Sequence, residues 1–295
     1  MTETLVPLGS LVLGFLVTRL IVTSMSAVLE ANILMRRNYR DRPIATARGL
    51  AIVFAVLVVE SVRTALGGLG IGTNEVSSLR NVVLLTAIGY GFLGFIDDCL
   101  AEGTDRGFRG HLAAAAHGRI TSGMLKLLGG GAMAFVLVAT AGFPDGRRLI
   151  IDGALIALSA NAGNVFDRAP GRTVKVSVLL AIPVAVLLGE QFGPVAIVIG
   201  AAIAMLPEER TERAMLGDTG ANPLGAVLAV GVVFGGSEMV RIGTLIFVLV
   251  VNLAAERWSF SAVIERSPLL RWLDGIGQSQ SRRDWVLQRA KANTS

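Results

Sequence analysis

The 295-residue chain is 53% hydrophobic and only 17% charged, and its mean hydropathy is +0.64. Because soluble domains are about a quarter charged, these values exclude a soluble globular protein and indicate a polytopic membrane protein. The single cysteine, Cys99, excludes an internal disulfide, and no cluster of cysteine and histidine suggests zinc. The net charge of +5 suits nucleic acid or anionic lipid, and its distribution along the chain decides between them.

The N-terminal stretch Leu5 to Leu29 is too long for the core of a signal peptide, and no basic residue precedes it. It predicts a retained first helix with the N-terminus outside. A spanning helix needs roughly 20 mostly apolar residues, and fewer where neighbouring helices thin the bilayer. Nine stretches meet this requirement, namely 5–33, 49–66, 81–98, 124–142, 149–166, 176–190, 192–206, 222–236 and 239–256. The sixth and seventh are short and separated only by Glu190-Gln191.

We therefore predict an all-α polytopic membrane protein in which residues 1–256 form a bundle of nine or ten spans. The tail, residues 257–295, contains no span. Its apolar side chains alternate with Arg and Asp, which predicts short amphipathic helices that lie on the inner leaflet or pack under the bundle.

Positive charge is distributed unequally between the two predicted faces. With the N-terminus outside, the inside segments are 34–48, 99–123, 167–175, 207–221 and the tail. Together with Lys126 they hold 21 of the 27 Lys and Arg residues, the outside face holds five, and Arg19 lies within the first span. This asymmetry predicts a multi-pass plasma-membrane protein with a cytoplasmic C-terminus. We therefore expect the basic residues to set the membrane orientation and to face anionic lipid of the inner leaflet, and not to bind nucleic acid.

Asp97 and Asp98 close the third span, in the sequence Gly94-Phe-Ile-Asp-Asp98. Neighbouring residues on a helix point about 100° apart, so one acid can face a ligand while the other orients a cation or a neighbouring group. Two acids at a helix end can also simply mark the membrane interface. Because the C-terminal end of a helix disfavours anions, however, this pair requires a cationic partner.

Asn161, Asn164 and Asp167 recur every three residues and form one stripe near the inner end of the fifth span. Small residues between them let another helix or a ligand approach closely. Amide and carboxylate oxygens are hard ligands that suit Mg²⁺. The alternative is that the Asn side chains only hydrogen-bond a neighbouring helix.

The segment Leu216-Gly-Asp218-Thr-Gly-Ala-Asn222 opens the eighth span. Free N–H groups at a helix N-terminus can hold a phosphate, and Asp218 is well placed as a metal ligand beside it. The alternative is a plain N-cap. Basic residues are predicted at the same face, namely Lys126, Arg168, Arg172 and Lys175, with Arg36, Arg37, Arg40, Arg42 and Arg48 in the first inside loop.

In order and spacing, these motifs resemble the polyprenyl-phosphate N-acetylhexosamine-1-phosphate transferase superfamily, also called glycosyltransferase family 4. The matching pieces are Gly94-Phe-Ile-Asp-Asp98, Lys126-Leu-Leu, Asn161-Ala-Gly-Asn164-Val-Phe-Asp167 and Leu216-Gly-Asp218-Thr-Gly-Ala-Asn222-Pro-Leu-Gly225. Arg42-Pro43 and Arg48-Gly49 resemble the family's first cytoplasmic loop. The resemblance covers residues 30–256. It implies transfer of a sugar-1-phosphate, such as N-acetylhexosamine-1-phosphate, from a UDP-sugar to a polyprenyl phosphate, with release of UMP, at the start of cell-envelope glycan assembly.

The resemblance also implies roles for individual residues. Asn164 and Asp218 would ligate Mg²⁺, for which Mn²⁺ could substitute. Asp97 or Asp98 would orient or deprotonate the lipid phosphate, and Lys126 would hold a phosphate. Asp167 would organise the nucleotide side, with Arg172 and Lys175 as further donor contacts. Asn161 and Asn222 complete the predicted substrate-binding set.

Two departures from the family pattern concern specificity. Pro170 stands where many members carry an acid or amide that contacts the base, and the tail lacks the histidine-rich motif common in bacterial members. The first departure leaves recognition of the uracil base unassigned, and the second leaves the sugar unassigned. A catalytically inactive member that serves as a membrane scaffold, or a lipid-handling or transport protein, remains the alternative, and a homodimer is left open. A transporter would place its charged residues at mid-membrane in paired repeats, whereas these acids lie at span ends.

Overall fold

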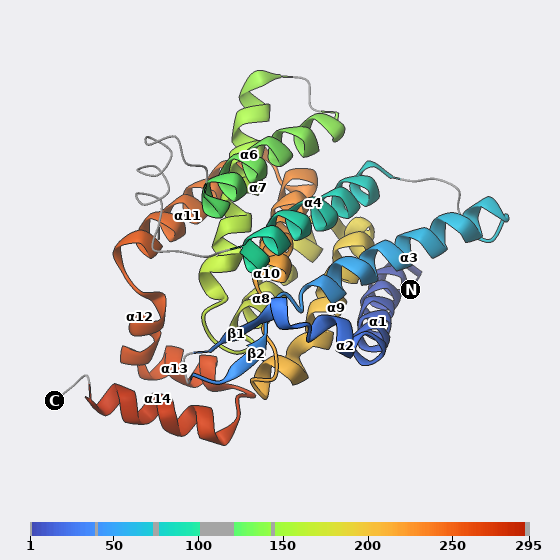
Figure 1. The fold of residues 1–295 in the computed structure, drawn as a ribbon. Coiled ribbons are helices and arrows are strands. Elements are labelled where there is room, and N and C mark those ends of the chain that lie inside the picture. Colours follow the sequence, from blue (N-terminus) through green and yellow to red (C-terminus); the bar gives the residue numbers. More distant parts are fainter. Residues whose placement is uncertain (1, 39–40, 73–76, 101–120, 143–144, 293–295) are drawn as a thin grey trace.

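The computed structural model describes residues 2–38, 41–72, 77–100, 121–142 and 145–292 (Figure 1). The long helices are α1 (Thr2–Ser24), α3 (Leu50–Gly68), α4 (Ser78–Leu100), α6 (Ser122–Thr140), α7 (Gly146–Phe166), α8 (Arg172–Leu188), α9 (Gly193–Arg210), α10 (Asp218–Gly235) and α11 (Glu238–Arg257). The short elements are α2 (Ser26–Leu29), η1 (Asn32–Leu34), β1 (Met35–Arg37), β2 (Pro43–Ala45), η2 (Gly189–Phe192), α12 (Phe260–Arg266), α13 (Pro268–Gly275) and α14 (Gln280–Ala292).

Within the described residues, eight helical segments are long and apolar enough to cross a membrane. The predicted class of a helical, polytopic membrane protein therefore agrees with the structure. One of the eight, 172–210, contains both the predicted sixth span, 176–190, and the predicted seventh, 192–206, as α8 and α9 joined by η2. This stretch folds back on itself at η2, where Gly189 has a φ of 54°. A Cβ on Gly171 would lie 3.3 Å from Leu206 Cδ2, so the start of α8 lies beside the end of α9.

The predicted first span, 5–33, is too long: α1 ends at Ser24. Its 23 residues already suffice to cross a bilayer, which needs roughly 20. The chain then forms α2, η1 and the hairpin of β1 and β2, in which Met35 pairs with Ala45. This hairpin was not predicted. Of the predicted loop 99–123, residues 101–120 lie outside the described part of the chain, as does Arg40 of the first loop.

The hairpin holds two helix ends side by side. Met215 N donates to Ala45 O at 2.8 Å and Arg48 N donates to Met215 O at 3.2 Å, which fixes the segment before α10. Arg36 Nη2 donates to Asp98 O and to Cys99 O, each at 3.1 Å, which satisfies carbonyl groups at the end of α4. The end of the bundle where α4 and α7 finish and α6 and α10 begin is called the motif end below.

Helix α10 is the centre of the bundle and packs against α3, α4, α7, α8 and α9. Glycines let the backbones approach closely. A Cβ on Gly163 of α7 would lie 2.2 Å from Ala221 O, and one on Gly94 of α4 would lie 2.2 Å from Asp218 O. Such small residues dominate helix interfaces in membranes, where lipid offers no hydrophobic force between helices. The motif glycines therefore hold α4 and α7 against the start of α10.

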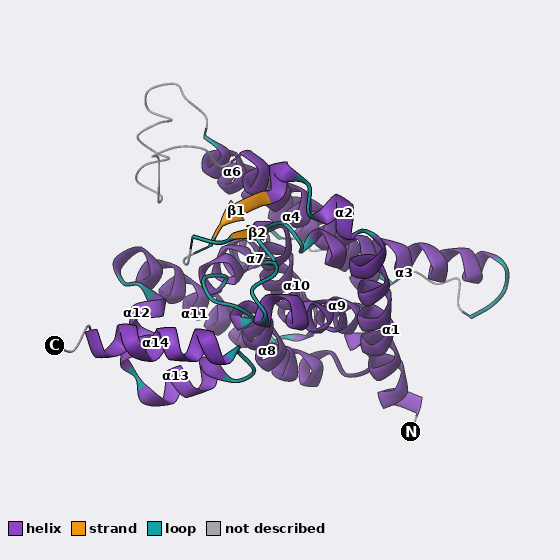
Figure 2. Ribbon diagram, turned by 60° about the horizontal axis from the view of Figure 1, so that its bottom comes forward, coloured by secondary structure: helices purple, strands orange, loops and turns teal. Residues whose placement is uncertain are grey.

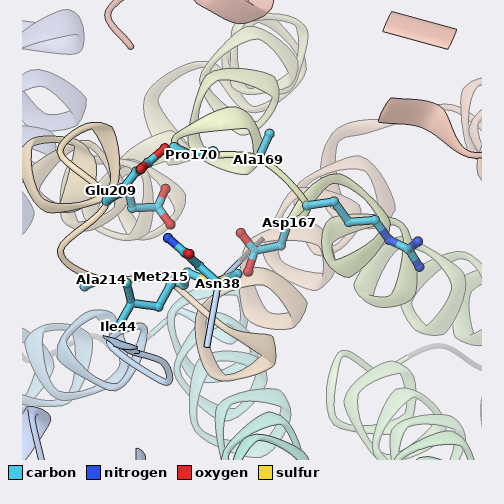
Figure 3. Close-up of a pocket in the computed structure, with 10 residues that line it drawn as sticks. Asn38, Ile44, Asp167, Ala169, Pro170, Glu209, Ala214 and Met215 are labelled. Atoms are coloured by element: carbon cyan, nitrogen blue, oxygen red, sulfur yellow. The ribbon is translucent and has the colours of Figure 1, made fainter. Parts of the chain in front are cut away.

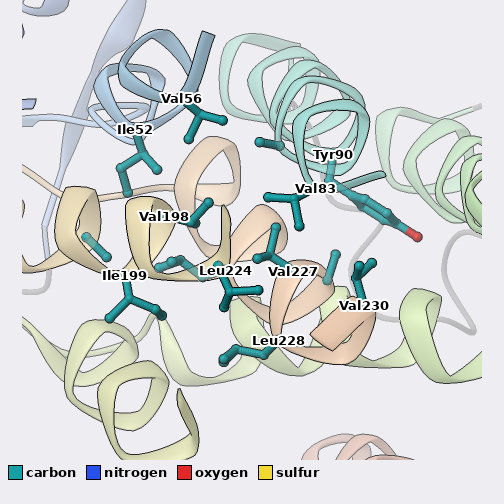
Figure 4. Packing of buried hydrophobic residues seen from close by; sticks show 14 of the residues in the cluster. Ile52, Val56, Val83, Tyr90, Val198, Ile199, Leu224, Val227, Leu228 and Val230 are labelled. Atoms are coloured by element: carbon teal, nitrogen blue, oxygen red, sulfur yellow. The ribbon is translucent and has the colours of Figure 1, made fainter. Parts of the chain in front are cut away.

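Apolar side chains fill the space between these helices, as Figure 4 shows for Ile52 and Val56 of α3, Val83 of α4, and Leu224 and Val227 of α10. The outward faces are also apolar: Leu20 is 65% exposed and Val186 is 80% exposed. In a soluble protein such exposure would favour aggregation, whereas in a membrane protein it faces lipid.

Charged residues within the spans are paired. Arg19 Nη1 lies 2.7 Å from Glu208 Oε1, which joins α1 to α9. Glu60 of α3 accepts from Arg80 of α4, with Nη2 and Oε2 2.7 Å apart, and from Arg63. Pairing of this kind is what makes charge tolerable at membrane depth.

The tail forms α12, α13 and α14, which lie beside the motif end (Figures 1 and 2). The ring of Phe260 on α12 lies 5.8 Å from the ring of Phe166, at the end of α7. Arg210, at the end of α9, donates to Gly277 O after α13. Of the two predicted arrangements, packing against the bundle is therefore observed in the structure.

Candidate functional site at the motif end

Asp98 caps helix α10 from the neighbouring helix α4. Its Oδ1 accepts from Asp218 N at 3.0 Å, and its Oδ2 accepts from Thr219 N at 3.0 Å and from Thr219 Oγ1 at 2.6 Å. A carboxylate is favourable at this position because it satisfies free N–H groups and meets the positive end of the helix dipole. Both oxygens are engaged, so Asp98 fixes the place and orientation of Asp218.

Lys126 is the cationic partner that the acids of α4 require. Thr121 Oγ1 caps α6 by accepting from Met124 N at 3.1 Å, which sets Lys126 in the first turns of that helix. Its Nζ donates to Asp218 Oδ2 and lies 3.9 Å from Asp97 Oδ2. The side chains of Lys126, Asp97 and Asp218 are 16%, 19% and 15% exposed. Water thus reaches these side chains, but they are partly desolvated. Charges in such an environment interact more strongly than they do in bulk water.

Asn164 brings α7 into the same cluster. Its Nδ2 donates to Asp218 Oδ2 at 3.3 Å. The two ends of a side-chain amide are assigned from the hydrogen bonds around them, and a cation on Asp218 would favour the opposite orientation, with the carbonyl oxygen inward. Four helix ends therefore meet at Asp218: the ends of α4 and α7 and the starts of α6 and α10.

Asp167 lies next to this cluster, directly after α7. Its Oδ1 accepts from Thr173 Oγ1 at 3.3 Å. Burial raises the pKa of Asp167 well above its ordinary value, and the negative charges of Glu209, Asp218 and Asp98 raise it further. The structure thus places Asp167 in the electrostatic field of the Asp218 cluster, although no hydrogen bond joins them within the described residues.

A small cavity of about 40 Å³ opens beside Asp167. Figure 3 shows the carboxylates of Asp167 and Glu209 on its two sides, with the Asn38 side chain between them. Glu209 Oε1 also accepts from Leu216 N at 2.9 Å and so ties the end of α9 to the segment before α10. This volume holds a few water-sized groups, so in this conformation the cavity admits only a small part of a ligand.

Two predicted substrate-binding residues do not join the cluster. Asn161 points to α11, where its Nδ2 donates to Asn252 Oδ1 at 2.5 Å. The alternative interpretation of a helix-to-helix hydrogen bond is thus the one observed. Asn222 lies one turn after Asp218 but is only 1% exposed, and its amide makes no hydrogen bond within the described residues. The Asn161 side chain is thus engaged by α11, and the Asn222 side chain is buried within the bundle.

Replacing Asn161 by alanine is expected to lower the free energy of unfolding by about 0.6 kcal/mol, the average for interhelical hydrogen bonds in membranes. Because the side chain faces α11, divalent-ion binding at Asp218 should be unchanged. Denaturation in detergent and Mn²⁺ titration followed by electron paramagnetic resonance measure the two quantities. A loss of Mn²⁺ binding in this variant would show that Asn161 contributes to the ion site.

Arg172 and Lys175 also lie away from Asp218. Both side chains hold the tail: Arg172 makes a two-fold ion pair with Asp274, and Lys175 Nζ donates to Asp274 O. The prediction that they face a donor substrate followed from their position after the Asn/Asp stripe. It did not anticipate an acid on α13 that pairs with them.

The donor set at Asp218 suits a hard divalent cation. Asp97, Asp218 and Asn164 offer only carboxylate and amide oxygens, and Mg²⁺ in proteins is commonly held by one or two carboxylates together with substrate phosphates and water. Within the described residues, no three His, Cys, Asp or Glu side chains gather closely enough to hold a metal alone. A cation at this position would therefore share Asp218 with Lys126 and take its remaining ligands from substrate and water.

Three residues of the motif end were missed by sequence reasoning. Thr219 lies inside a motif that was singled out, and its hydrogen bonds to Asp98 could have been considered. Glu209 and Thr173 carry no local signal, because their hydrogen bonds with Leu216 N and Asp167 Oδ1 span seven and six residues across turns, which no helix or strand periodicity indicates. Acids within a loop between two spans are ordinarily solvated, so Glu209 could not be distinguished from Glu208.

Comparison of the chain with protein-family models and with the curated proteins gives no match. The resemblance to polyprenyl-phosphate sugar-1-phosphate transferases thus rests on the sequence motifs alone.

Proposed function

We propose that the protein is a membrane enzyme that transfers a sugar-1-phosphate from a UDP-sugar to a polyprenyl phosphate and releases UMP. One observation carries the proposal: Asp97, Asp98, Lys126, Asn164 and Asp218 come from four helix ends and meet at one point. A cluster of oxygen ligands beside one lysine suits a phosphate-bearing substrate with a divalent cation. The motifs that supply these residues are the ones in which the chain resembles that superfamily.

The reaction is a displacement at phosphorus. An oxygen of the lipid phosphate attacks the phosphorus bonded to the sugar, the bond from that phosphorus to the bridging oxygen breaks, and UMP leaves with the electron pair. The second pKa of a phosphate monoester is about 6, so at neutral pH the attacking oxygen is already deprotonated and needs no strong base. The protein is therefore required mainly for positioning and for electrostatic stabilisation.

Each residue of the cluster has a distinct task in this proposal. Asp218 and Asn164 hold the cation, which neutralises the pyrophosphate charge when bound. Lys126 supplies a second positive charge for a phosphate oxygen. Asp97 lies 3.9 Å from Lys126 Nζ and orients it. Because both Asp98 oxygens are engaged by α10, the structure favours Asp97 over Asp98 for any direct contact with the lipid phosphate.

An apolar cavity of about 330 Å³ supports a lipid acceptor. It lies among α7, α8, α10 and α11, and its lining includes Phe166, the residue before Asp167. The lining is almost entirely apolar, which suits hydrocarbon. A lipid-handling protein without catalysis would also use such a cavity, and it is this observation that keeps that second function open.

The membrane side follows from charge and from the course of the chain. We propose that the motif end faces the cytoplasm of the plasma membrane, because the loops and the tail at that end carry most of the Lys and Arg residues. If α8 and α9, which fold back on each other, each cross the membrane, a cytoplasmic motif end implies that the N-terminus lies outside and the tail inside. Anionic lipid of the inner leaflet is then the proposed surface partner of the tail.

The direct test is UMP release by the purified protein with Mg²⁺, polyprenyl phosphate and a panel of UDP-sugars. We expect release with at least one donor. Chelation by EDTA should abolish it, and added Mg²⁺ or Mn²⁺ should restore it, because the oxygen ligands alone leave the pyrophosphate charge uncompensated.

The control omits polyprenyl phosphate, which separates transfer from hydrolysis of the donor. Absence of UMP release across the panel, with lipid still co-purifying, would favour the lipid-handling alternative. UMP release that survives EDTA would contradict the metal role of Asp218.

A further inference from the structure

The C-terminal tail contacts the segment that carries Asp167 at several points. This segment, residues 166–175, joins the end of α7 to the start of α8 and is called the Asp167 segment below. The Phe166 ring packs against Phe260 of α12 at 5.8 Å. Gln278 Nε2 lies 3.5 Å from Pro170 O. The tail thus contacts the segment at its beginning and in its middle.

The strongest contact is an ion pair between α8 and α13. Arg172 donates from Nε and Nη2 to the two oxygens of Asp274 at 2.8 and 2.9 Å. Its Nη1 donates to Ser261 Oγ of α12 at 3.1 Å. Arg172 is 3% exposed and the Asp274 side chain is 11% exposed. Two parallel hydrogen bonds in a desolvated position fix the orientation and the separation of the two side chains, which a single exposed salt bridge does not do.

Further contacts complete the attachment at the end of α13. Lys175 Nζ donates to Asp274 O and lies 3.5 Å from Ile276 O. Arg210 of α9 donates to Gly277 O. Burial alone would raise the pKa of Asp274, but the hydrogen bonds and charge of Arg172, with the charges of Lys175 and Arg282, outweigh it, and the pKa is lowered. The carboxylate is thus stabilised in its charged, paired form.

Hydrogen bonds connect the start of α8, where Arg172 lies, to Asp167. Arg172 N donates to Ala169 O at 3.1 Å, and the next residue, Thr173, donates from Oγ1 to Asp167 Oδ1 at 3.3 Å. Gly171, which precedes Arg172, has a φ of 69°, a backbone conformation that favours glycine. The turn into α8 therefore has a defined backbone conformation. A shift of Arg172 would therefore change the side-chain contact of Asp167.

We propose that Asp274 is a positioning residue that acts through Arg172 to hold the Asp167 segment beside the Asp218 cluster. The tail is then part of the site and not an appendage to the bundle. The consequence for catalysis rests on the proposed function, in which Asp167 serves the nucleotide side of the donor. Release of Asp274 should weaken binding of the donor more than it slows the chemical step.

Hydrogen–deuterium exchange measured by mass spectrometry tests the positioning without reference to activity. In Asp274→Asn, peptides covering 166–175 and 259–278 should both exchange faster than in the wild type, while α10 peptides stay protected. Asp274→Glu should recover much of the protection because it keeps the charge. Asp284→Asn is the matched control, since Asp284 lies on the exposed face of α14 and accepts a hydrogen bond from Gln280 of the same helix.

Faster exchange confined to the tail, or no change in either region, would overturn the proposal, because the Asp167 segment would then hold its shape alone. If the wild type transfers sugar-1-phosphate, Asp274→Asn should raise the KM for the UDP-sugar several-fold with a smaller loss in kcat. An equal loss in kcat with unchanged KM would also contradict it. If the wild type shows no transfer, the proposed function fails while the exchange result still decides the positioning.

Discussion

Asp218→Asn is expected to lower UMP release by about 10²- to 10³-fold, on the scale of losing a principal electrostatic group in an active site. The substitution keeps size and hydrogen-bonding capacity but removes the charge that holds both the cation and Lys126. Asp98 caps α10 through the backbone N–H groups of Asp218 and Thr219, so the helix start should keep its place. Steady-state UMP release from proteoliposomes measures the effect.

The control for this substitution is Asp284→Asn, in which an exposed carboxylate of the tail is neutralised in the same way. Thermal unfolding in detergent should be little changed in both variants. If Asp218→Asn retains transfer near the wild-type rate while remaining folded, Asp218 does not hold the cation and the assignment of the cluster is wrong.

Gly94→Ala is expected to impair transfer about 10²-fold, the effect of misplacing a reacting group by about 1 Å. An added Cβ would lie 2.2 Å from Asp218 O and 2.6 Å from Thr219 N, and neither backbone atom can move without separating α4 from α10. The separation breaks the Asp98 cap and shifts Asp218 away from Lys126. Overpacking of this kind also costs about 1–3 kcal/mol of stability. UMP release and thermal unfolding measure the two effects.

Gly131→Ala is the matched control, because a Cβ at this position of α6 would meet nothing within 4 Å. Alanine favours a helix over glycine by about 1 kcal/mol, so this variant should be neutral or slightly stabilised. Equal activity in the two alanine variants would show that close packing of α4 on α10 is not what positions Asp218.

The helical membrane class and the meeting of three motifs were predictable from the sequence. The apolar stretches have the length of a bilayer, and the motifs stand at ends that alternate regularly from one face to the other. The requirement of Asp97 and Asp98 for a cation also followed from helix physics, and Lys126 meets it. Each of these inferences uses a local property of the chain.

The remainder depends on tertiary contacts that no local pattern encodes. Nothing in the sequence around Arg172 indicates that its partner is Asp274, about a hundred residues later, and not a substrate. Asn161 shares a helical stripe with Asn164, yet Asn161 hydrogen-bonds α11 and Asn164 hydrogen-bonds the start of α10. The hairpin of β1 and β2 was read as a plain loop because its strands are only three residues long.

The decisive observation is where a divalent ion binds in the purified protein. Crystals soaked in Mn²⁺, with and without UDP-sugar, would show the ion by its anomalous scattering. We expect a peak in contact with Asp218, within reach of Asn164 and Asp97, that is lost in Asp218→Asn. A peak elsewhere with none at Asp218, with donor bound, would contradict a magnesium-dependent phosphotransfer site at the meeting point of the four helices.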